Sequence, residues 1–175
     1  MQILNRLVDY DQRIFLWCAA FSHTKNLHTA ARIISRTGDG YLQVFLPLLI
    51  WAYIGASAFT FVNILVFAFT VERSLYWVLK NSLKRRRPPA AIPRFKAMIT
   101  ASDEFSFPSG HTSGAVLLAI LVSSYIPALT IPLFGWMACV GLSRVILGVH
   151  FPADIIAGLA LGGSIALLFL TVLPV

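Results

Sequence analysis

Three short polar clusters interrupt a strongly apolar sequence, and each carries residue types suited to anion binding or proton transfer. The first is KNSLKRRRP, from Lys80 to Pro88. Two of its cations, Lys80 and Arg87, are seven residues apart, about two helical turns. A helix continuing over this segment would align them on one face as a clamp for a dianionic group. The alternative is a positively charged flank that only anchors a helix at the membrane surface.

The second cluster, PSGH, runs from Pro108 to His111 and directly precedes a long apolar run. Ser109 is a favoured helix N-cap, and Gly110 lets the backbone approach a ligand closely. The free amides of a helix that begins here would form an anion site. A histidine at its rim can transfer a proton near neutral pH. The alternative is a capped helix start with a hydrogen-bonded histidine.

The third cluster, SRVILGVHFPAD, runs from Ser143 to Asp154. Arg144 offers another planar donor group for a phosphate. His150 and Asp154 have the i, i+4 spacing, and Pro152 is placed to open a helix. A carboxylate one turn away can accept a proton from one ring nitrogen and leave the other free to attack. The alternative is a helix-start carboxylate that only satisfies backbone amides.

The elements that position these clusters are predicted to be membrane helices. Of the 175 residues, 58% are hydrophobic and 12% are charged, and the mean hydropathy is +0.78. A soluble domain carries about twice that share of charge, so the solvent of this chain is expected to be lipid. We expect one membrane-embedded domain over residues 1–175. Spans are predicted near Tyr41–Ala56, Ser57–Leu79, Thr112–Ile126, Leu129–Leu142 and Ala153–Leu173.

The N-terminal segment LNRLVDYDQRIFLWCAAF mixes charged and apolar residues. This mixture favours an amphipathic helix on the membrane surface, and a sixth, incomplete span is the alternative. The following segment, with His23 and His28, is interpreted as a polar connector. If the five predicted spans alternate across the membrane, all three polar clusters meet on one membrane face, which is the main inference from the pattern.

The distribution of charge narrows the range of possible functions. The net charge is +7, and a basic run lies between Lys80 and Lys96. Such a run could bind nucleic acid, anionic lipid headgroups or a phosphorylated substrate, and nucleic acid is the weakest option for a chain embedded in a bilayer. Within the run, Arg85 is expected to point away from the site and to attract headgroups.

Other polar and small residues receive structural interpretations. The TGDG segment around Asp39 is interpreted as a turn or a helix-entry feature and not as a ligand. Gly158 and Gly162 have the spacing of a close helix contact. Glu72 and Arg73 are costly inside a span, where they would pair with each other's neighbours or face the site. Cys18 and Cys139 lack metal-ligand spacing and are expected to be buried hydrophobic side chains.

Taken together, the three clusters resemble the signature of the type 2 phosphatidic acid phosphatase family. That signature is Lys, six residues and Arg-Pro; then Pro-Ser-Gly-His; then Ser-Arg, five residues, His, three residues and Asp. Every position is filled in order, over about 75 residues from Lys80 to Asp154. The resemblance implies an all-α, integral-membrane helical bundle with five to six transmembrane helices and an amphipathic N-terminal helix.

The resemblance also implies a metal-independent hydrolase with no cofactor. His150 would be the nucleophile that forms a phosphohistidine, Asp154 would orient it, and His111 would protonate the leaving oxygen. The phosphoryl oxygens would be held by a set of cations and backbone donors: Lys80, Arg87, Ser109, Gly110 and Arg144. The substrate would be a lipid phosphate, such as undecaprenyl pyrophosphate, phosphatidylglycerophosphate, phosphatidic acid or a lipid A phosphate.

The expected location is a bacterial inner membrane with the site facing the periplasm. Charge counting alone would put the basic face in the cytoplasm, but these cations have a catalytic reason to be there. The sequence leaves the oligomeric state open. The alternative function is a catalytically silent membrane protein that binds anionic lipids through its basic loop.

Overall fold

A computed structural model describes residues 2–20 and 24–171, and in that part of the chain every regular element is helical. The elements in chain order are α1 (Gln2–Ala20), α2 (Lys25–Thr37), α3 (Tyr41–Ile54), η1 (Gly55–Ala58), α4 (Phe59–Leu83), α5 (Pro88–Ala91), α6 (Gly110–Tyr125), η2 (Pro127–Leu129), α7 (Thr130–Ile146) and α8 (Pro152–Leu170).

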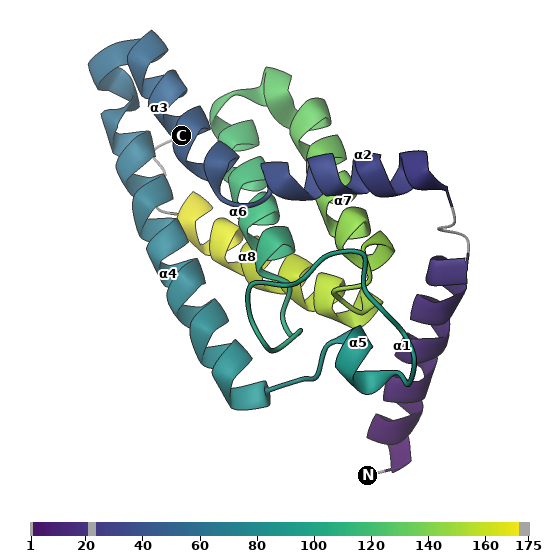
Figure 1. Ribbon diagram of the computed structural model, residues 1–175. Helices are drawn as coiled ribbons and strands as arrows, with labels where there is room; N and C mark the ends of the chain where they lie inside the picture. The colour runs from purple at the N-terminus through teal and green to yellow at the C-terminus, as the bar shows by residue number, and fades with distance from the viewer. Residues whose placement is uncertain (1, 21–23, 172–175) are drawn as a thin grey trace.

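The five predicted spans correspond to α3, α4, α6, α7 and α8. The stretch Tyr41–Leu83 folds back on itself at η1, so that α3 and α4 form a hairpin (Figure 1). This stretch, Pro127–Ile146 and Pro152–Leu170 are long and apolar enough to cross a membrane, and α6 is apolar but shorter. The predicted all-α, integral-membrane bundle is therefore confirmed.

Helix α6 forms the centre of the bundle, and most of its residues are buried. It packs most extensively against α8 and α7, and also against α4. The α8 contact depends on the absence of side chains, because a Cβ on Gly158 would lie 2.7 Å from the Ser109 carbonyl oxygen. A Cβ on Gly162 would likewise overlap the Ser113 backbone. The predicted close helix packing at these glycines is confirmed.

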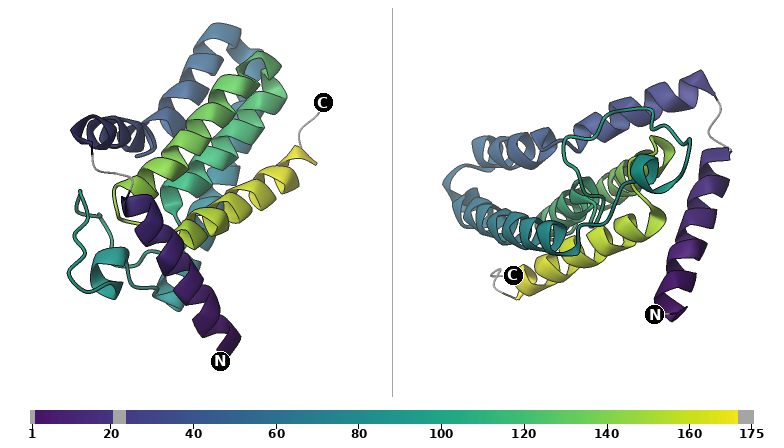
Figure 2. Two further views of the ribbon diagram at one scale, coloured as in Figure 1. Left: turned by 90° about the vertical axis from the view of Figure 1, so that its right-hand side faces the viewer. Right: turned by 60° about the horizontal axis from the view of Figure 1, so that its bottom comes forward.

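Helix α1 lies outside the bundle, beside the ends of α7 and α8 (Figure 2). Phe15 is fully buried between Phe95 and Phe151, with ring centroids 5.0 and 5.3 Å away. Tyr10 and Trp17 on the same helix are more than half exposed. Among the described helices, α1 does not meet the criteria of a span. One docked side and one exposed apolar side match the predicted interfacial helix.

The interpretation of the next segment as a polar connector is wrong, because residues 25–37 form α2. Thr24 caps this helix by accepting a hydrogen bond from the Leu27 amide. The helix crosses in front of α7 (Figure 1), and Trp136 donates from Nε1 to Thr37 Oγ1 at 2.8 Å. His28 lies within α2, and His23 is outside the described residues.

The prediction that α4 continues over the basic segment is wrong. The helix ends at Leu83, and Lys84 adopts a left-handed conformation with φ of 45°. The chain then runs extended, so Arg87 reaches the site from a strand-like segment and not from the face that carries Lys80. The long loop after α5 folds back under the bundle. There the Met98 carbonyl accepts a hydrogen bond from Arg32 Nη2, and the Met98 amide donates to the Leu147 carbonyl.

Candidate active site

A cavity of about 1020 Å³ opens between α3, α4, α6 and the turn that joins α7 to α8. Its lining changes character along its length. One end carries the cations and histidines of the three sequence clusters, whereas the other is apolar and is formed by α3 and α4 residues such as Val44, Leu48, Val62 and Val66. The shape and lining suit an amphiphile with an anionic head.

The first cluster supplies two cations that share one carboxylate. Lys80 Nζ and Arg87 Nη2 both form ion pairs with Asp103, and Lys80 also contacts the Tyr76 hydroxyl at 2.5 Å. Lys80 and Arg87 are almost fully buried, while Asp103 is about one third exposed. Although partial burial raises it, hydrogen bonds from Lys80 and Tyr76 hold the pKa of Asp103 well below its usual value. The two cations are thus fixed side by side at the polar end of the cavity.

The second cluster begins α6, as predicted. Ser109 is the N-cap and its Oγ accepts from the Thr112 amide at 3.4 Å. A Cβ on Gly110 would lie 2.8 Å from the Tyr76 ring, so only glycine fits there. In the part of the chain described, the amides of Gly110 and His111 have no backbone partner. This leaves two donors at a helix N-terminus for an anion.

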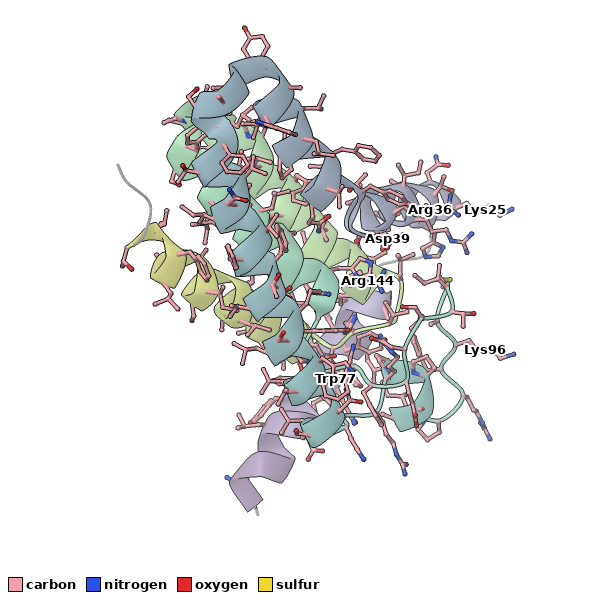
Figure 3. The ribbon with its side chains drawn as sticks, turned by 90° about the vertical axis from the view of Figure 1, so that its left-hand side faces the viewer. Lys25, Arg36, Asp39, Trp77, Lys96 and Arg144 are labelled. Atoms are coloured by element: carbon pink, nitrogen blue, oxygen red, sulfur yellow. The ribbon has the colours of Figure 1, made fainter. Side chains whose placement is uncertain are left out.

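His111 is oriented by a residue that the sequence reasoning treated as part of a turn. Its Nε2 lies 2.6 Å from Asp39 Oδ1, and both residues line the cavity. Asp39 belongs to the short turn between α2 and α3, which brings it over the start of α6 (Figure 3). The contact implies that the Nε2 of His111 carries a proton, since a carboxylate can only accept one.

The third cluster places Arg144 on the same cavity. Its Nη1 donates to Ser35 Oγ of α2 at 2.5 Å, and the side chain is almost fully buried. The Nε of Arg144 is buried and makes no hydrogen bond with the described residues. A buried cation with an unused donor at the cavity wall is suited to an anionic ligand.

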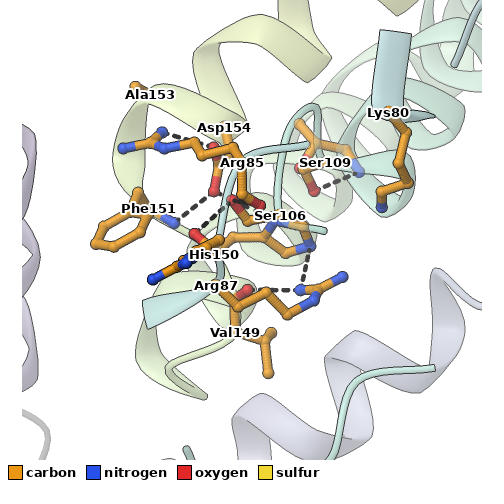
Figure 4. A network of polar contacts seen from close by, with 12 residues as sticks. Lys80, Arg85, Arg87, Ser106, Ser109, Val149, His150, Phe151, Ala153 and Asp154 are labelled. Atoms are coloured by element: carbon orange, nitrogen blue, oxygen red, sulfur yellow. Dashed lines mark hydrogen bonds and ion pairs between the residues drawn. The ribbon is translucent and has the colours of Figure 1, made fainter. Parts of the chain in front are cut away.

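His150 lies between a cation and a carboxylate (Figure 4). Its Nδ1 is 3.5 Å from Asp154 Oδ2, and its Nε2 is 3.4 Å from Arg87 Nη1. Asp154 is fully buried and also accepts a hydrogen bond from the Phe151 amide at 2.8 Å. Asp154 therefore caps α8, as one of the two sequence interpretations has it, and it also lies beside His150, where its role in orienting the ring stays a prediction. With the Nδ1 proton facing the carboxylate, Nε2 is unprotonated and its lone pair faces the Arg87 guanidinium at the cavity wall.

Burial keeps the His150 ring neutral. It lowers the pKa of His150 to about 4, and the nearby Arg87 acts in the same direction, whereas Asp154 opposes the shift. At neutral pH the imidazole is therefore unprotonated, which is the state required of a nucleophile.

The expectation for Arg85 is wrong. Its Nη1 donates to Asp154 Oδ1 at 2.6 Å, and its Nη2 forms a 2.5 Å ion pair with Asp11 of α1. Asp11 in turn accepts from the Ala153 amide at 2.9 Å. Arg85 points inward because the left-handed residue Lys84 redirects the chain after α4. The interfacial helix is thereby linked to the carboxylate behind His150.

The structure brings most of the predicted site residues to one cavity. Six of them line it, namely Lys80, Arg87, Gly110, His111, Arg144 and His150. Ser109 and Asp154 are fully buried and lie behind that lining.

Sequence reasoning missed four supporting residues: Asp11, Ser35, Asp39 and Asp103. The position of Asp39, directly before a span on the face where the clusters converge, was a usable signal. No local pattern marks the other three.

Comparisons with known proteins are consistent across sequence and structure. A sequence profile described as the PAP2 superfamily matches residues 50–174. Phosphatidylglycerophosphatase B of Bacillus subtilis is 31% identical over 181 aligned positions, which cover 85% of each chain. Decaprenylphosphoryl-5-phosphoribose phosphatase of Mycobacterium tuberculosis is 29% identical over 119 positions, which cover 66% of this chain. The chain spans only 56% of the length of that relative.

Two solved structures are similar in fold to this chain. The crystal structure of LpxE from Aquifex aeolicus has a TM-score of 0.76 at 26% identity, covering 91% of this chain and 94% of that one. A transmembrane PAP2-type phosphatidylglycerolphosphate phosphatase from Bacillus subtilis has a TM-score of 0.52 at 27% identity, covering 93% and 94%. The first superposition is the closer of the two by TM-score.

Proposed function

Because the chain belongs to the PAP2 superfamily, we propose that it is a lipid phosphatase that hydrolyses a phosphomonoester or diphosphate through a phosphohistidine. The whole chain, residues 1–175, would act as a single membrane-embedded phosphatase domain. The observation that carries the proposal is His150, a buried neutral imidazole whose Nε2 faces a cavity of cations while Nδ1 lies 3.5 Å from Asp154.

In the first chemical step, His150 Nε2 attacks phosphorus and the bond from phosphorus to the leaving oxygen breaks. The leaving oxygen takes a proton from Nδ1 of a protonated His111, whose Nε2 proton is held by Asp39 at 2.6 Å. The negative charge of the transferring group is held by Lys80, Arg87 and Arg144, and also by the free amides at the start of α6. Phosphoryl transfer depends mainly on such positioning and charge stabilisation.

In the second step, water replaces the lipid at the leaving position. His111, now neutral, accepts a proton from this water as its oxygen attacks phosphorus, and the bond to His150 Nε2 breaks. Inorganic phosphate leaves and both histidines return to their starting states. Ser109 supports this site as the cap of α6, because its hydroxyl is committed to Thr112.

The substrate is proposed to be a membrane lipid phosphate. Its chain would lie in the apolar end of the cavity between α3 and α4, and its phosphate would reach the cations at the polar end. Undecaprenyl pyrophosphate, phosphatidylglycerophosphate, phosphatidic acid and a lipid A phosphate all meet these requirements. We place the protein in a bacterial inner membrane with the site facing the periplasm, which labelling of single cysteines from either side would test.

Phosphate release from a panel of purified lipid phosphates tests the proposal. The wild-type protein should release phosphate from at least one of them, and His150→Ala should release none. Lys96→Ala is the matched control, since Lys96 carries a charge of the same basic run and does not line the cavity. Lipid binding without phosphate release would instead support the catalytically silent alternative.

A further inference from the structure

An ion pair inside α4 lies between the phosphate end and the apolar end of the cavity. Arg73 precedes Lys80 by two helical turns, and the apolar residues Phe69 and Val66 follow farther along the same wall. Arg73 Nε and Nη2 each lie 2.5 Å from a carboxylate oxygen of Glu72. The sequence left open whether this pair faces the site, and the structure shows that Arg73 lines the cavity.

Contacts hold the guanidinium of Arg73 in place but do not occupy all of its nitrogen atoms. Glu72 is fully buried, whereas the Arg73 side chain is 49% exposed. Its Nη2 also donates to the Gly110 carbonyl at 3.1 Å and to Ser113 Oγ at 3.3 Å, and Ser113 Oγ donates to the same Glu72 oxygen that Nη2 contacts. Among the described residues, Nη1 makes no hydrogen bond. Buried ion pairs add little stability over apolar side chains of similar size, so an arginine kept inside a span points to a ligand.

A second polar group faces Arg73 from the opposite wall. On α6, a Cβ at Gly114 would lie 3.2 Å from Gln43 Nε2 and 4.0 Å from Arg73 Nη2. The Oε1 of Gln43 only accepts hydrogen bonds and is buried without a partner among the described residues, so the amide donor Nε2, which lies at this surface, is the atom that can bind an anion. Gln43 and Arg73 therefore flank the same surface of α6. That surface lies one turn, about 5.4 Å, beyond Gly110.

We propose that Arg73 and Gln43 form a second subsite, which binds a non-scissile phosphoryl group between the scissile phosphate and the lipid chain. This inference rests on the proposed function and narrows its substrate class to lipids that carry two phosphoryl groups. One helical turn matches the spacing of two phosphoryl groups joined directly or through a short polyol. A lipid with a single phosphate would leave the free Nη1 of Arg73 without an anion.

Matched substrate pairs test the subsite and identify the linkage. One pair is farnesyl diphosphate and farnesyl monophosphate, and the other is phosphatidylglycerophosphate and phosphatidic acid with the same acyl chains. The quantity compared is the ratio of kcat/KM for the two-phosphate member to that for the one-phosphate member. In the wild-type protein this ratio should exceed ten in at least one pair, and that pair identifies the linkage.

The variant of choice is Glu72→Gln/Arg73→Gln, because Arg73→Gln alone would leave a buried, unpaired carboxylate. Loss of a charge-assisted hydrogen bond should lower the ratio about tenfold to one hundredfold. The control Lys96→Gln removes the same charge from a residue that extends away from the bundle (Figure 3), and it should leave the ratio unchanged. Arg73→Lys, which keeps the charge, should recover part of the ratio.

Two results would overturn the subsite: a wild-type ratio near one in both pairs, or a ratio that the double variant leaves unchanged. Either outcome differs from failure of the proposed function. If the proposed function failed, the wild-type protein would hydrolyse neither member of any pair, or His150→Ala would stay active.

Discussion

Replacing Arg85 by alanine should damage both stability and turnover, although Arg85 does not line the cavity. The change removes the 2.6 Å contact to Asp154 and the 2.5 Å contact to Asp11. A hydrogen bond to a charged group contributes about 1.5–3 kcal/mol, and breaking a buried pair costs about 3–5 kcal/mol. Because the Arg85 side chain is 22% exposed, solvent screens part of these interactions. We therefore expect the free energy of unfolding to fall by about 3 kcal/mol.

This loss translates into measurable quantities. For a chain of this length about 1 kcal/mol shifts Tm by about 2–4 °C, so Arg85→Ala should lower Tm by about 6–12 °C. Asp154 would lose an anchor, and a misplacement of His150 by about 1 Å can reduce kcat about a hundredfold. KM should change little, because Arg85 does not contact the cavity.

The assay is thermal unfolding in detergent together with steady-state kinetics on one lipid phosphate. Arg86→Ala is the matched control, since the neighbouring Arg86 is exposed and, among the described residues, is held through its backbone alone. The control should stay within about 0.5 kcal/mol of the wild-type stability. If the Arg85 and Arg86 variants behaved alike in both measurements, the proposed link from α1 to Asp154 would be refuted.

Three further predictions concern the chemistry. His111→Ala should lose about a hundredfold to ten thousandfold in kcat with an alkyl phosphate and much less with nitrophenyl phosphate, and Asp39→Asn should show a smaller loss of the same kind; equal losses on both substrates would contradict a general acid. EDTA should leave hydrolysis intact while orthovanadate inhibits it, because side-chain cations hold the phosphate; magnesium-dependent recovery after EDTA would contradict this. Folding lowers the pKa of His150 to about 4. The unfolded chain therefore binds the extra proton first, and stability should fall as pH drops from about 6.5 towards 4. Thermal unfolding should show a smaller loss of stability in acid for His150→Gln than for the wild-type protein, and equal losses would refute the assignment.

The sequence predicted the spans and the convergence of the polar clusters because both follow from hydrophobic length and strict alternation across a membrane. Side chains close to an element boundary were less predictable. Arg85 and Arg87 were assigned directions on a continuing helix, but Lys84 takes a left-handed conformation, and the extended chain that follows turns Arg85 inward as well as Arg87. Nothing in the composition of the run KRRRP fixes which lysine or arginine ends the helix.

The supporting residues depend on tertiary packing that no local pattern encodes. Ser35 reaches Arg144 only because α2 crosses α7, and Asp103 reaches Lys80 only because a long loop folds back under the bundle. The amphipathic helix α2 itself had a readable start, with Thr24 as N-cap before Leu27. Its polar residues and two nearby histidines favoured a connector instead.

The most direct test of the central claim is the identity of the phosphorylated residue during turnover. Rapid quenching in alkali, where phosphohistidine survives, followed by peptide mass spectrometry would locate the transferred group. The account predicts phosphate on His150 in the wild-type protein, and more of it in His111→Ala with nitrophenyl phosphate as substrate. Phosphate on any other residue, or continued turnover by His150→Ala, would contradict the account.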